Sequence, residues 1–384
     1  MTVIPATEEI AALPGPTRFV DRVADDLNAG KSVIVVFPDS LVDEGIADVV
    51  LYNLGREGVG TTSCYESTEP FPERVLITFG ADPRRDTNFA DWDTIADWGP
   101  WHGSWVVIRG WVHDDAEEVV DRWPPQLTAC GLSMEDRPKL IVGARLGDLS
   151  RKKIAHVDRS GVAVHWWWGV FDRIDTELRL ALSSDRPLNP VESAVIVEVA
   201  GWELRCVDFL VGDWDGTTAG LQESLNRYRS RVIEPSNIPE MGHGRRLITE
   251  PPAHLEQAWR NGLVDRWSYG IRSAVDILND VDVTQRLWMA HNRVLGQYVD
   301  EERAEYERMI LSKTSRRSLE GLRIRDDDII EIGSLAWLVD TRRVDIGKSH
   351  RERLQTFRDV RNDLAHRRPV TDELMRRVTA YLEF

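Results

Sequence analysis

The chain has 384 residues, of which 42% are hydrophobic and 29% charged, the composition of an ordinary globular protein of two or three domains. Its three cysteines, Cys64, Cys130 and Cys206, are far apart and form no CxxC pair, which argues against a disulfide framework or a zinc ribbon. No apolar run approaches the roughly 18 residues of a membrane helix, and no secretory signal begins the chain. We therefore expect a soluble, cytoplasmic protein with no membrane partner.

The net charge of −16 is unevenly distributed along the chain. Residues 245–384 carry a balance of +1 and the preceding residues one of −17. This acidity argues against wrapping a long nucleic-acid duplex, which needs many phosphate-neutralising side chains. Residues 340–377 hold 11 basic and 7 acidic residues, so a local anion site near the C-terminus is compatible with the charge. Only six of the 48 basic residues are lysine, which indicates a GC-rich bacterial genome.

The first 230 residues alternate short Val/Ile-rich runs with amphipathic segments. Continuous apolar runs separated by helices are typical of a parallel sheet covered on both faces. We predict strands at 31–40, 74–82, 104–112, 138–146 and within 161–180, helices at 17–30, 42–58 and 113–131, and a long helix followed by a turn at 190–216. The fold class expected for residues 1–230 is therefore α/β, with a mostly parallel sheet.

Residues 231–252 are rich in Pro, Gly and polar residues, and we expect a linker there. The remaining chain, residues 253–384, has an almost purely helical pattern. We predict five helices with short connections, at 253–279, 283–313, 328–343, 349–368 and 371–383. These would form an all-α C-terminal helical bundle.

The usual nucleotide-binding motifs are missing from the N-terminal half. A P-loop places GxxxxGK[ST] after the first strand, but that position reads FPDSLVDEG, in which the proline lacks an N–H and the carboxylates repel phosphate. Arg109 ends one predicted strand, and Asp82 is the only acid at the end of another. The layout resembles the degenerate P-loop modules that precede effector domains in bacterial conflict proteins. That resemblance implies a module without nucleotide hydrolysis, and a plain sensor or scaffold domain is the competing interpretation.

Tryptophans are concentrated in HWWWGVF (165–171) and between residues 92 and 111. Aromatic rings in such numbers can form a stacking platform for bases, or they can fill a core. The surrounding residues of the second group are acidic. We therefore expect a core or protein-interface role.

The segment DVRNDLAHRRPV, residues 359–370, has a helical pattern with two distinct faces. At 100° per residue its apolar positions form one stripe, with Arg361 about 55° from the stripe's centre. Asn362 and His366 are four residues apart and share the opposite face. One interpretation is a solvated helix end, where a protonated histidine and Arg367 and Arg368 each gain about 0.3–1 kcal/mol from the helix dipole.

The second interpretation rests on a resemblance. In a late helix of a small bundle, Arg361, Asn362 and His366 match the Arg-polar-x₃-His pattern of the HEPN superfamily (higher eukaryotes and prokaryotes nucleotide-binding domain). The resemblance covers residues 250–384, and it implies a HEPN-like helical domain. Many members are endoribonucleases that need no metal and form their site across a homodimer.

By that resemblance the protein is a homodimeric, metal-independent endoribonuclease that acts on RNA in antiviral defence or in a toxin-like role, without a cofactor. His366 would move a proton near neutral pH, Arg361 would stabilise the phosphate, and Asn362 would position the imidazole. Substrate-binding residues would be Arg358, Arg367 and Arg368. The alternative is a non-catalytic HEPN adaptor whose acidic N-terminal domain binds a protein partner.

Overall fold

A computed structural model describes residues 7–57, 69–85, 87–157, 162–229, 249–268, 270–314 and 329–382. The chain forms two compact units, each assembled from separate stretches of sequence. The sheet unit comprises Ile4–Asp175 and Pro239–Ala274. The helical unit comprises Met1–Val3, Thr176–Ile238 and Val275–Phe384.

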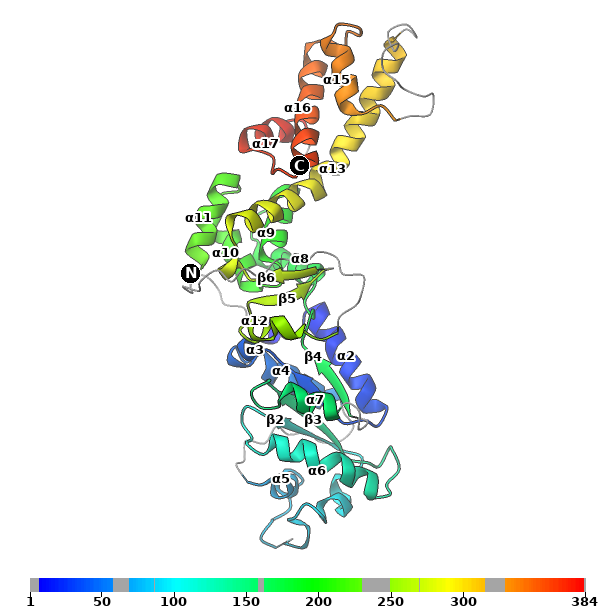
Figure 1. Cartoon of the computed structure of the whole chain (residues 1–384), viewed down its shortest axis with the longest axis vertical. Helices are drawn as coiled ribbons and strands as arrows, with labels where there is room; N and C mark the ends of the chain where they lie inside the picture. The colour runs from blue at the N-terminus through cyan, green and yellow to red at the C-terminus, as the bar shows by residue number, and fades with distance from the viewer. Residues whose placement is uncertain are drawn as a thin grey trace. The chain divides into compact units, whose positions relative to one another are not determined.

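The sheet unit contains a four-stranded parallel sheet with the order β2-β3-β1-β4 (Figure 1). The strands are β1 (Val33–Val36), β2 (Trp105–Arg109), β3 (Lys139–Ala144) and β4 (Ala163–Trp166). Strand β1 is buried along its whole length, as expected for a central strand covered on both faces. The prediction of a parallel α/β sheet is confirmed.

Helices cover both faces of this sheet. One face is covered by α2 and α4, which contact each other; α4 packs on β2 and β3, and α2 on β1. Right-handed crossovers place α6 and α7 on the opposite face, and Figure 1 shows both in front of the strands. The helices of this unit include α1 (Thr7–Ala11), α2 (Pro14–Asn28), α3 (Asp39–Asp43), α4 (Ile46–Glu57), α6 (Ala116–Ala129) and α7 (Arg151–Val157). The single helix predicted over 42–58 is thus two, separated at Gly45, whose φ is +75°.

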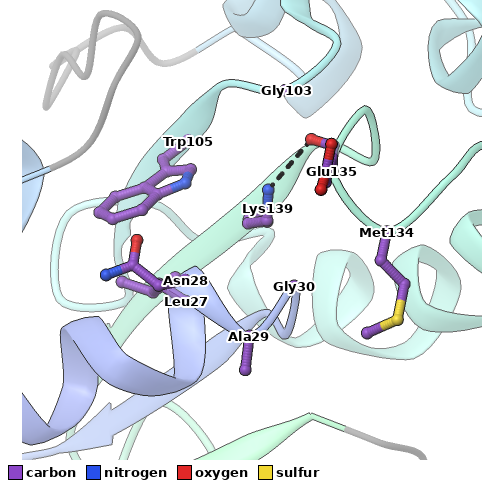
Figure 2. A pocket seen from close by; sticks show the side chains of 9 residues that line it. All are labelled: Leu27, Asn28, Ala29, Gly30, Gly103, Trp105, Met134, Glu135 and Lys139. Atoms are coloured by element: carbon purple, nitrogen blue, oxygen red, sulfur yellow. Dashed lines mark hydrogen bonds between the residues drawn. The ribbon is translucent and has the colours of Figure 1, made fainter.

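The amino ends of β2 and β3 meet the end of α2 around a cavity, shown in Figure 2.

The tryptophans of the sheet unit lie mainly in its core. Among them Trp101, Trp123 and Trp167 are almost fully buried. The expectation that these rings fill a core is confirmed for these three residues.

The strand predicted over 74–82 is wrong, because these residues begin in helix α5 (Phe71–Thr78). A short apolar run does not distinguish a strand from a buried helix by its pattern alone. Two contacts select the helix: the Asp115 carboxylate accepts the N–H of Phe71 at 3.0 Å and pairs with Arg74 at 2.7 Å. Asp82 follows this helix in an exposed turn and does not end a strand.

The helix predicted over 253–279 is also wrong. Only α12 (Glu256–Arg260) is α-helical there, and an antiparallel hairpin follows, formed by β5 (Val264–Trp267) and β6 (Gly270–Ser273). Gly262, with φ +70°, and Ser268, with φ +57°, take backbone conformations outside a helix. Three of the four residues of β5 are buried, so the strand has no alternating pattern that would have distinguished this hairpin from a helix.

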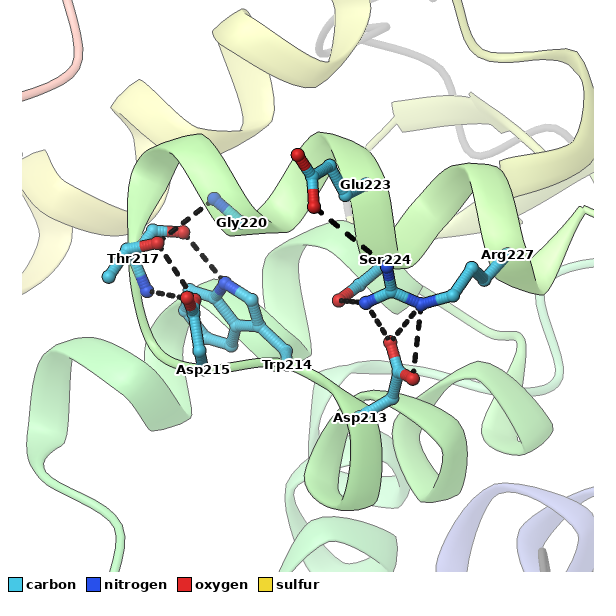
Figure 3. A network of polar contacts seen from close by, with 8 residues as sticks. All are labelled: Asp213, Trp214, Asp215, Thr217, Gly220, Glu223, Ser224 and Arg227. Atoms are coloured by element: carbon cyan, nitrogen blue, oxygen red, sulfur yellow. Dashed lines mark hydrogen bonds and ion pairs between the residues drawn. The ribbon is translucent and has the colours of Figure 1, made fainter.

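The first half of the helical unit contains α8 (Arg173–Ser183), α9 (Pro190–Ala200), α10 (Leu204–Asp213) and α11 (Thr218–Tyr228). In place of the long helix and turn predicted over 190–216 there are two helices, because Gly201 ends α9 with φ +59°. Figure 3 shows how α10 and α11 are joined. Arg227 of α11 pairs with Asp213, the last residue of α10, at 2.7 Å. In the turn between the two helices, the Trp214 indole donates a hydrogen bond to the Thr217 carbonyl at 2.7 Å. Thr217 caps α11 by accepting the Gly220 N–H.

The second half contains α13 (Asp280–Lys313), α15 (Ile332–Asp340), α16 (Lys348–Ala365) and α17 (Asp372–Thr379). The long helix α13 packs against α9, α15 and α16, while α16 also contacts α15 and α17 (Figure 1). The four C-terminal helices predicted from the pattern are therefore present. No helix among the described residues is long and apolar enough to span a membrane.

The two units divide the chain differently from the predicted ranges 1–230, 231–252 and 253–384. Residues 176–229 belong to the helical unit, and residues 249–274 belong to the sheet unit. The physical reason for the second difference is a tryptophan contact: the buried Trp259 indole donates to the Trp167 carbonyl at 3.1 Å. Of the expected linker, residues 231–248 lie outside the described residues.

Candidate functional site

The predicted site residues Arg361 and Asn362 lie on helix α16, and His366 lies at its end. Its apolar stripe is buried against the neighbouring helices, as predicted, and consists of Leu354, Phe357, Val360 and Leu364. Asn362 and His366 are exposed, and Arg361 is partly exposed. The periodic pattern therefore predicted correctly which residues of this helix face solvent.

The helix ends in a Schellman motif built without glycine. Ala365 is the last helical residue and His366 is the C-cap. Arg367 takes the left-handed conformation with φ +55°. Its N–H bonds the Leu364 carbonyl at 3.1 Å, and the Arg368 N–H bonds the Asp363 carbonyl at 2.9 Å. A non-glycine residue in this conformation carries strain of about 1 kcal/mol or more.

Two side chains of α13 fix the backbone on either side of this end. The Trp288 indole donates to the Leu364 carbonyl at 2.8 Å. The buried His291 ring accepts the Val370 N–H through Nδ1 at 3.0 Å. Burial lowers the pKa of His291 to about 4, although Asp372 opposes the shift. The segment from Leu364 to Val370 is thus attached to the core at both of its ends.

The start of α17, just after this segment, is held as well. Thr371 caps the helix by accepting the Leu374 N–H at 3.3 Å. The Asp372 carboxylate accepts the N–H of Thr218 at 2.7 Å, at the beginning of α11. A carboxylate at a helix N-terminus is favoured by the helix dipole.

Asn362 and His366 share a face but are joined through the backbone only. The His366 N–H bonds the Asn362 carbonyl at 3.1 Å. Among the described residues, neither the Asn362 amide nor the His366 imidazole has a hydrogen-bond or ion-pair partner. Asn362, which we expect to position the imidazole, makes no side-chain hydrogen bond to it in the described structure, and both groups are accessible.

Arg361 and Arg358, the two predicted site arginines within α16, have carboxylate partners. Arg361 pairs with Glu331, the N-cap residue of α15, at 3.1 Å. Their side chains are 43% and 63% exposed, so solvent screens this pair and its strength is small. Arg358 bonds both Asp340, at 3.3 Å, and Asp359, at 3.0 Å. Asp359 therefore pairs with Arg358 and not with Arg361.

Arg367 and Arg368 extend the exposed surface beyond His366. The Arg367 guanidinium lies 5.9 Å from the centroid of the Trp288 ring, within the range of a cation–π contact. Near them, burial and the like charge of Asp359 raise the pKa of Asp363, against the opposing charges of Arg368 and His366. The end of α16 thus presents an imidazole, an amide and two guanidinium groups to solvent.

The carboxyl edge of the parallel sheet, where α/β proteins usually bind ligands, is filled by ion pairs. Arg109 ends β2 as predicted and pairs with Asp48 at 3.0 Å. Asp39, which follows β1 at the P-loop position, pairs with Arg260 of α12 at 2.8 Å. Arg145 after β3 makes a two-pronged contact with Asp148. These pairs neutralise the charges that a nucleotide phosphate would need there.

Comparison of the sequence with known protein families and with curated proteins finds no match. In the described ranges no group of three or more His, Cys, Asp or Glu side chains is arranged to hold a metal ion. The end of α16 is therefore assessed on its own geometry.

Two contacts of this site could not be read from the sequence. Glu331 precedes an apolar helix and carries no signal that it will meet Arg361, thirty residues later. The sequence pattern places Trp288 on one face of a helix but does not show what it contacts. Its hydrogen bond to the Leu364 carbonyl depends on how α13 crosses α16. Both contacts are tertiary, and periodicity reports only the helix to which each residue belongs.

Proposed function

We propose that this protein is an endoribonuclease that cleaves RNA at the end of helix α16 without a metal ion. The observation that supports the proposal is the pair of accessible polar groups, Asn362 and His366, beside two exposed arginines. Attack of a ribose 2′-OH on the adjacent phosphate needs a proton acceptor and a cation next to the phosphate. An imidazole meets the first need near neutral pH, and a guanidinium meets the second.

A single copy of α16 does not place all the required groups on one side. Positions 361 and 366 are about 140° apart around a helix, so Arg361 and His366 face different directions. Two copies related by a twofold axis bring both residue types into one cleft. We therefore propose that the active form is a homodimer through the C-terminal helices.

The first experiment measures cleavage of single-stranded RNA in EDTA. The wild type is expected to cut, and His366→Ala to reduce the rate by about 100-fold or more, the usual contribution of a general acid or base. His254→Ala, at an exposed histidine of the sheet unit, is the matched control and keeps the wild-type rate. Intact RNA in the wild-type reaction, over a range of RNA sequences and salt concentrations, contradicts the proposal.

A second experiment tests the shared cleft. Wild-type chains are mixed with increasing proportions of His366→Ala chains and allowed to exchange. If each site needs both copies, activity falls with the square of the wild-type fraction. A linear decline shows that each chain works alone and removes the dimeric site from the proposal.

A second candidate, a non-catalytic adaptor, is favoured by the carboxylates that bind Arg361 and Arg358. An arginine already paired is a weaker phosphate ligand. Glu331→Gln separates the two candidates, because it releases Arg361 while removing little stability from an exposed pair. Faster RNA cleavage in this variant supports the endoribonuclease. Unchanged, undetectable cleavage together with a dimer that still forms supports the adaptor.

A further inference from the structure

The sheet unit contains a cavity of about 370 Å³ at the amino edge of the parallel sheet. Its walls are formed by the end of α2, the first residues of β2 and β3, and the turn before β3 (Figure 2). Its volume is in the range of small-molecule sites. The cavity lies at the edge opposite to the ion pairs that fill the carboxyl ends of the strands.

Two glycines set the shape of this cavity. Gly30, with φ +83°, lies so close to Met134 that a Cβ atom there would be 3.2 Å from the Met134 carbonyl oxygen. Gly103, with φ +72°, donates its N–H to the Asp136 carbonyl at 2.7 Å. The turn is closed by Ser133, whose hydroxyl donates to the Asp136 carboxylate at 2.8 Å. The wall formed by the turn is therefore held at defined positions.

The lining combines apolar surface with one buried cation. The apolar surface that the cavity exposes comes mainly from Met134, which is 58% exposed, whereas Leu27 and Trp105 are lining residues with almost no exposed surface. Lys139, the first residue of β3, is only 6% exposed. Its ammonium group has one hydrogen bond among the described residues, to the Glu135 carbonyl at 3.4 Å (Figure 2). That distance is long compared with the usual value of about 2.9 Å.

A buried ammonium with three donors and one long hydrogen bond is incompletely satisfied. Burial lowers the pKa of Lys139, while the neighbouring charges of Asp136 and Glu135 oppose this shift. Both of those carboxylate residues are exposed, so water screens much of their effect. An acceptor that enters the cavity would complete the hydrogen bonding of Lys139.

We propose that this cavity binds a small molecule with an apolar, flat body and a single carboxylate group. The body would lie against Met134, and the carboxylate would accept hydrogen bonds from Lys139. A monoanion fits better than a phosphate dianion, because Lys139 is the one cation among the residues that line the cavity. The inference is independent of the proposed RNA site, which lies in the other unit.

The test uses 1-naphthoate and its neutral analogue 1-naphthamide, with binding measured by titration calorimetry on the full-length protein. We expect 1-naphthoate to bind saturably and at least about tenfold more tightly than the amide, the difference typical of one charged hydrogen bond. Lys139→Met keeps the apolar stem and removes the charge, so it abolishes this preference. Lys152→Met, at an exposed lysine of α7, leaves the preference unchanged.

A second variant, at Met134, keeps the proposal testable if Lys139→Met does not fold. Met134 is 58% exposed at the cavity, so Met134→Glu adds a negative charge without disturbing the core. It is expected to weaken 1-naphthoate binding several-fold more than Met134→Gln, which changes the apolar contact without adding a charge. Equal affinity for the two ligands, or no saturable binding of either up to millimolar concentration, overturns the proposal.

Chemical labelling gives an independent readout, because the chain has only six lysines. Acetylation with an N-hydroxysuccinimide ester is mapped by mass spectrometry with and without 1-naphthoate. Protection of Lys139, with unchanged labelling of Lys152, supports the assignment. Equal labelling of Lys139 in both samples contradicts it.

Discussion

The Trp288 indole of α13 donates a 2.8 Å hydrogen bond to the Leu364 carbonyl, within the last turn of α16. That carbonyl also accepts the Arg367 N–H at 3.1 Å. One acceptor therefore joins the long helix to the turn that carries His366, Arg367 and Arg368. The position of the proposed site depends on a residue that lies far from it in the sequence.

Trp288→Phe keeps an aromatic ring and removes the donor. We expect the free energy of unfolding to fall by about 1 kcal/mol, since the Leu364 carbonyl retains its backbone partner. Urea denaturation measures this change, and hydrogen exchange at the Arg367 amide is expected to accelerate. Trp202→Phe is the matched control, because the half-buried Trp202 indole has no hydrogen-bond partner within the described residues. An equal loss of stability in both variants would mean that ring size, and not the hydrogen bond, is responsible.

Arg367→Gly relieves the left-handed strain at the end of α16. We expect it to raise the free energy of unfolding by about 0.5–1 kcal/mol while weakening RNA binding, because it removes an exposed cation. Arg342→Gly is the matched control: Arg342 has φ +58° at the corresponding position after α15. Both variants should gain stability in thermal denaturation, and only Arg367→Gly should lose RNA affinity. Equal RNA affinity in the two variants would remove Arg367 from the proposed binding surface.

His291 makes the helical unit sensitive to acid. Its pKa is lowered to about 4 by burial, so the folded state holds the neutral ring while the unfolded chain gains a proton below about pH 6.5. The stability that depends on this neutral ring is present above pH 6.5 and is lost as the pH falls towards 4, by up to about 3 kcal/mol. His291→Asn keeps an acceptor for the Val370 N–H without a titrating ring. Urea denaturation at pH 7, 5.5 and 4.5 should show a smaller loss in the variant, and parallel curves would contradict this role.

Glu203 has the opposite pH dependence. The residue is partly exposed, whereas its carboxyl group is enclosed and accepts hydrogen bonds from the Val275 N–H and the Tyr228 hydroxyl. Burial raises the pKa of this carboxyl to about 7. The folded state therefore binds a proton more tightly than the unfolded chain does, and the resulting stability is present below about pH 4.5 and lost as the pH rises through 7.

Glu203→Gln mimics the protonated carboxyl at every pH. At pH 8 we expect this variant to be more stable than the wild type by about 1–3 kcal/mol, and at pH 4.5 to match it. Glu192→Gln would not serve as a control because Glu192 forms the capping box of α9, so the exposed Glu223 is the better comparison site. A stability difference that is the same at pH 4.5 and pH 8 would show that Glu203 does not titrate as described.

The sequence by itself determined the parallel sheet and the solvent-facing side of α16. Both follow from local periodicity: continuous Val and Ile runs mark β1, β2 and β3, and the spacing from Leu354 to Leu364 marks one helical face. The same reasoning failed at residues 74–82 and 253–279, where short apolar runs fit either a helix or a strand. There Asp115 and Trp259, which are distant in sequence, select the observed conformation.

Only the tertiary structure decided which charges near the proposed site are free. The sequence places Arg358, Arg361, Arg367 and Arg368 on one helix and the turn after it, with nothing to separate them. In the folded chain, carboxylates from α15 pair with the first two, whereas His366, Arg367 and Arg368 stay exposed at the helix end. The physical reason is that ion pairs and caps form between elements whose crossing is set by side-chain packing, and periodicity along one element carries no information about that crossing.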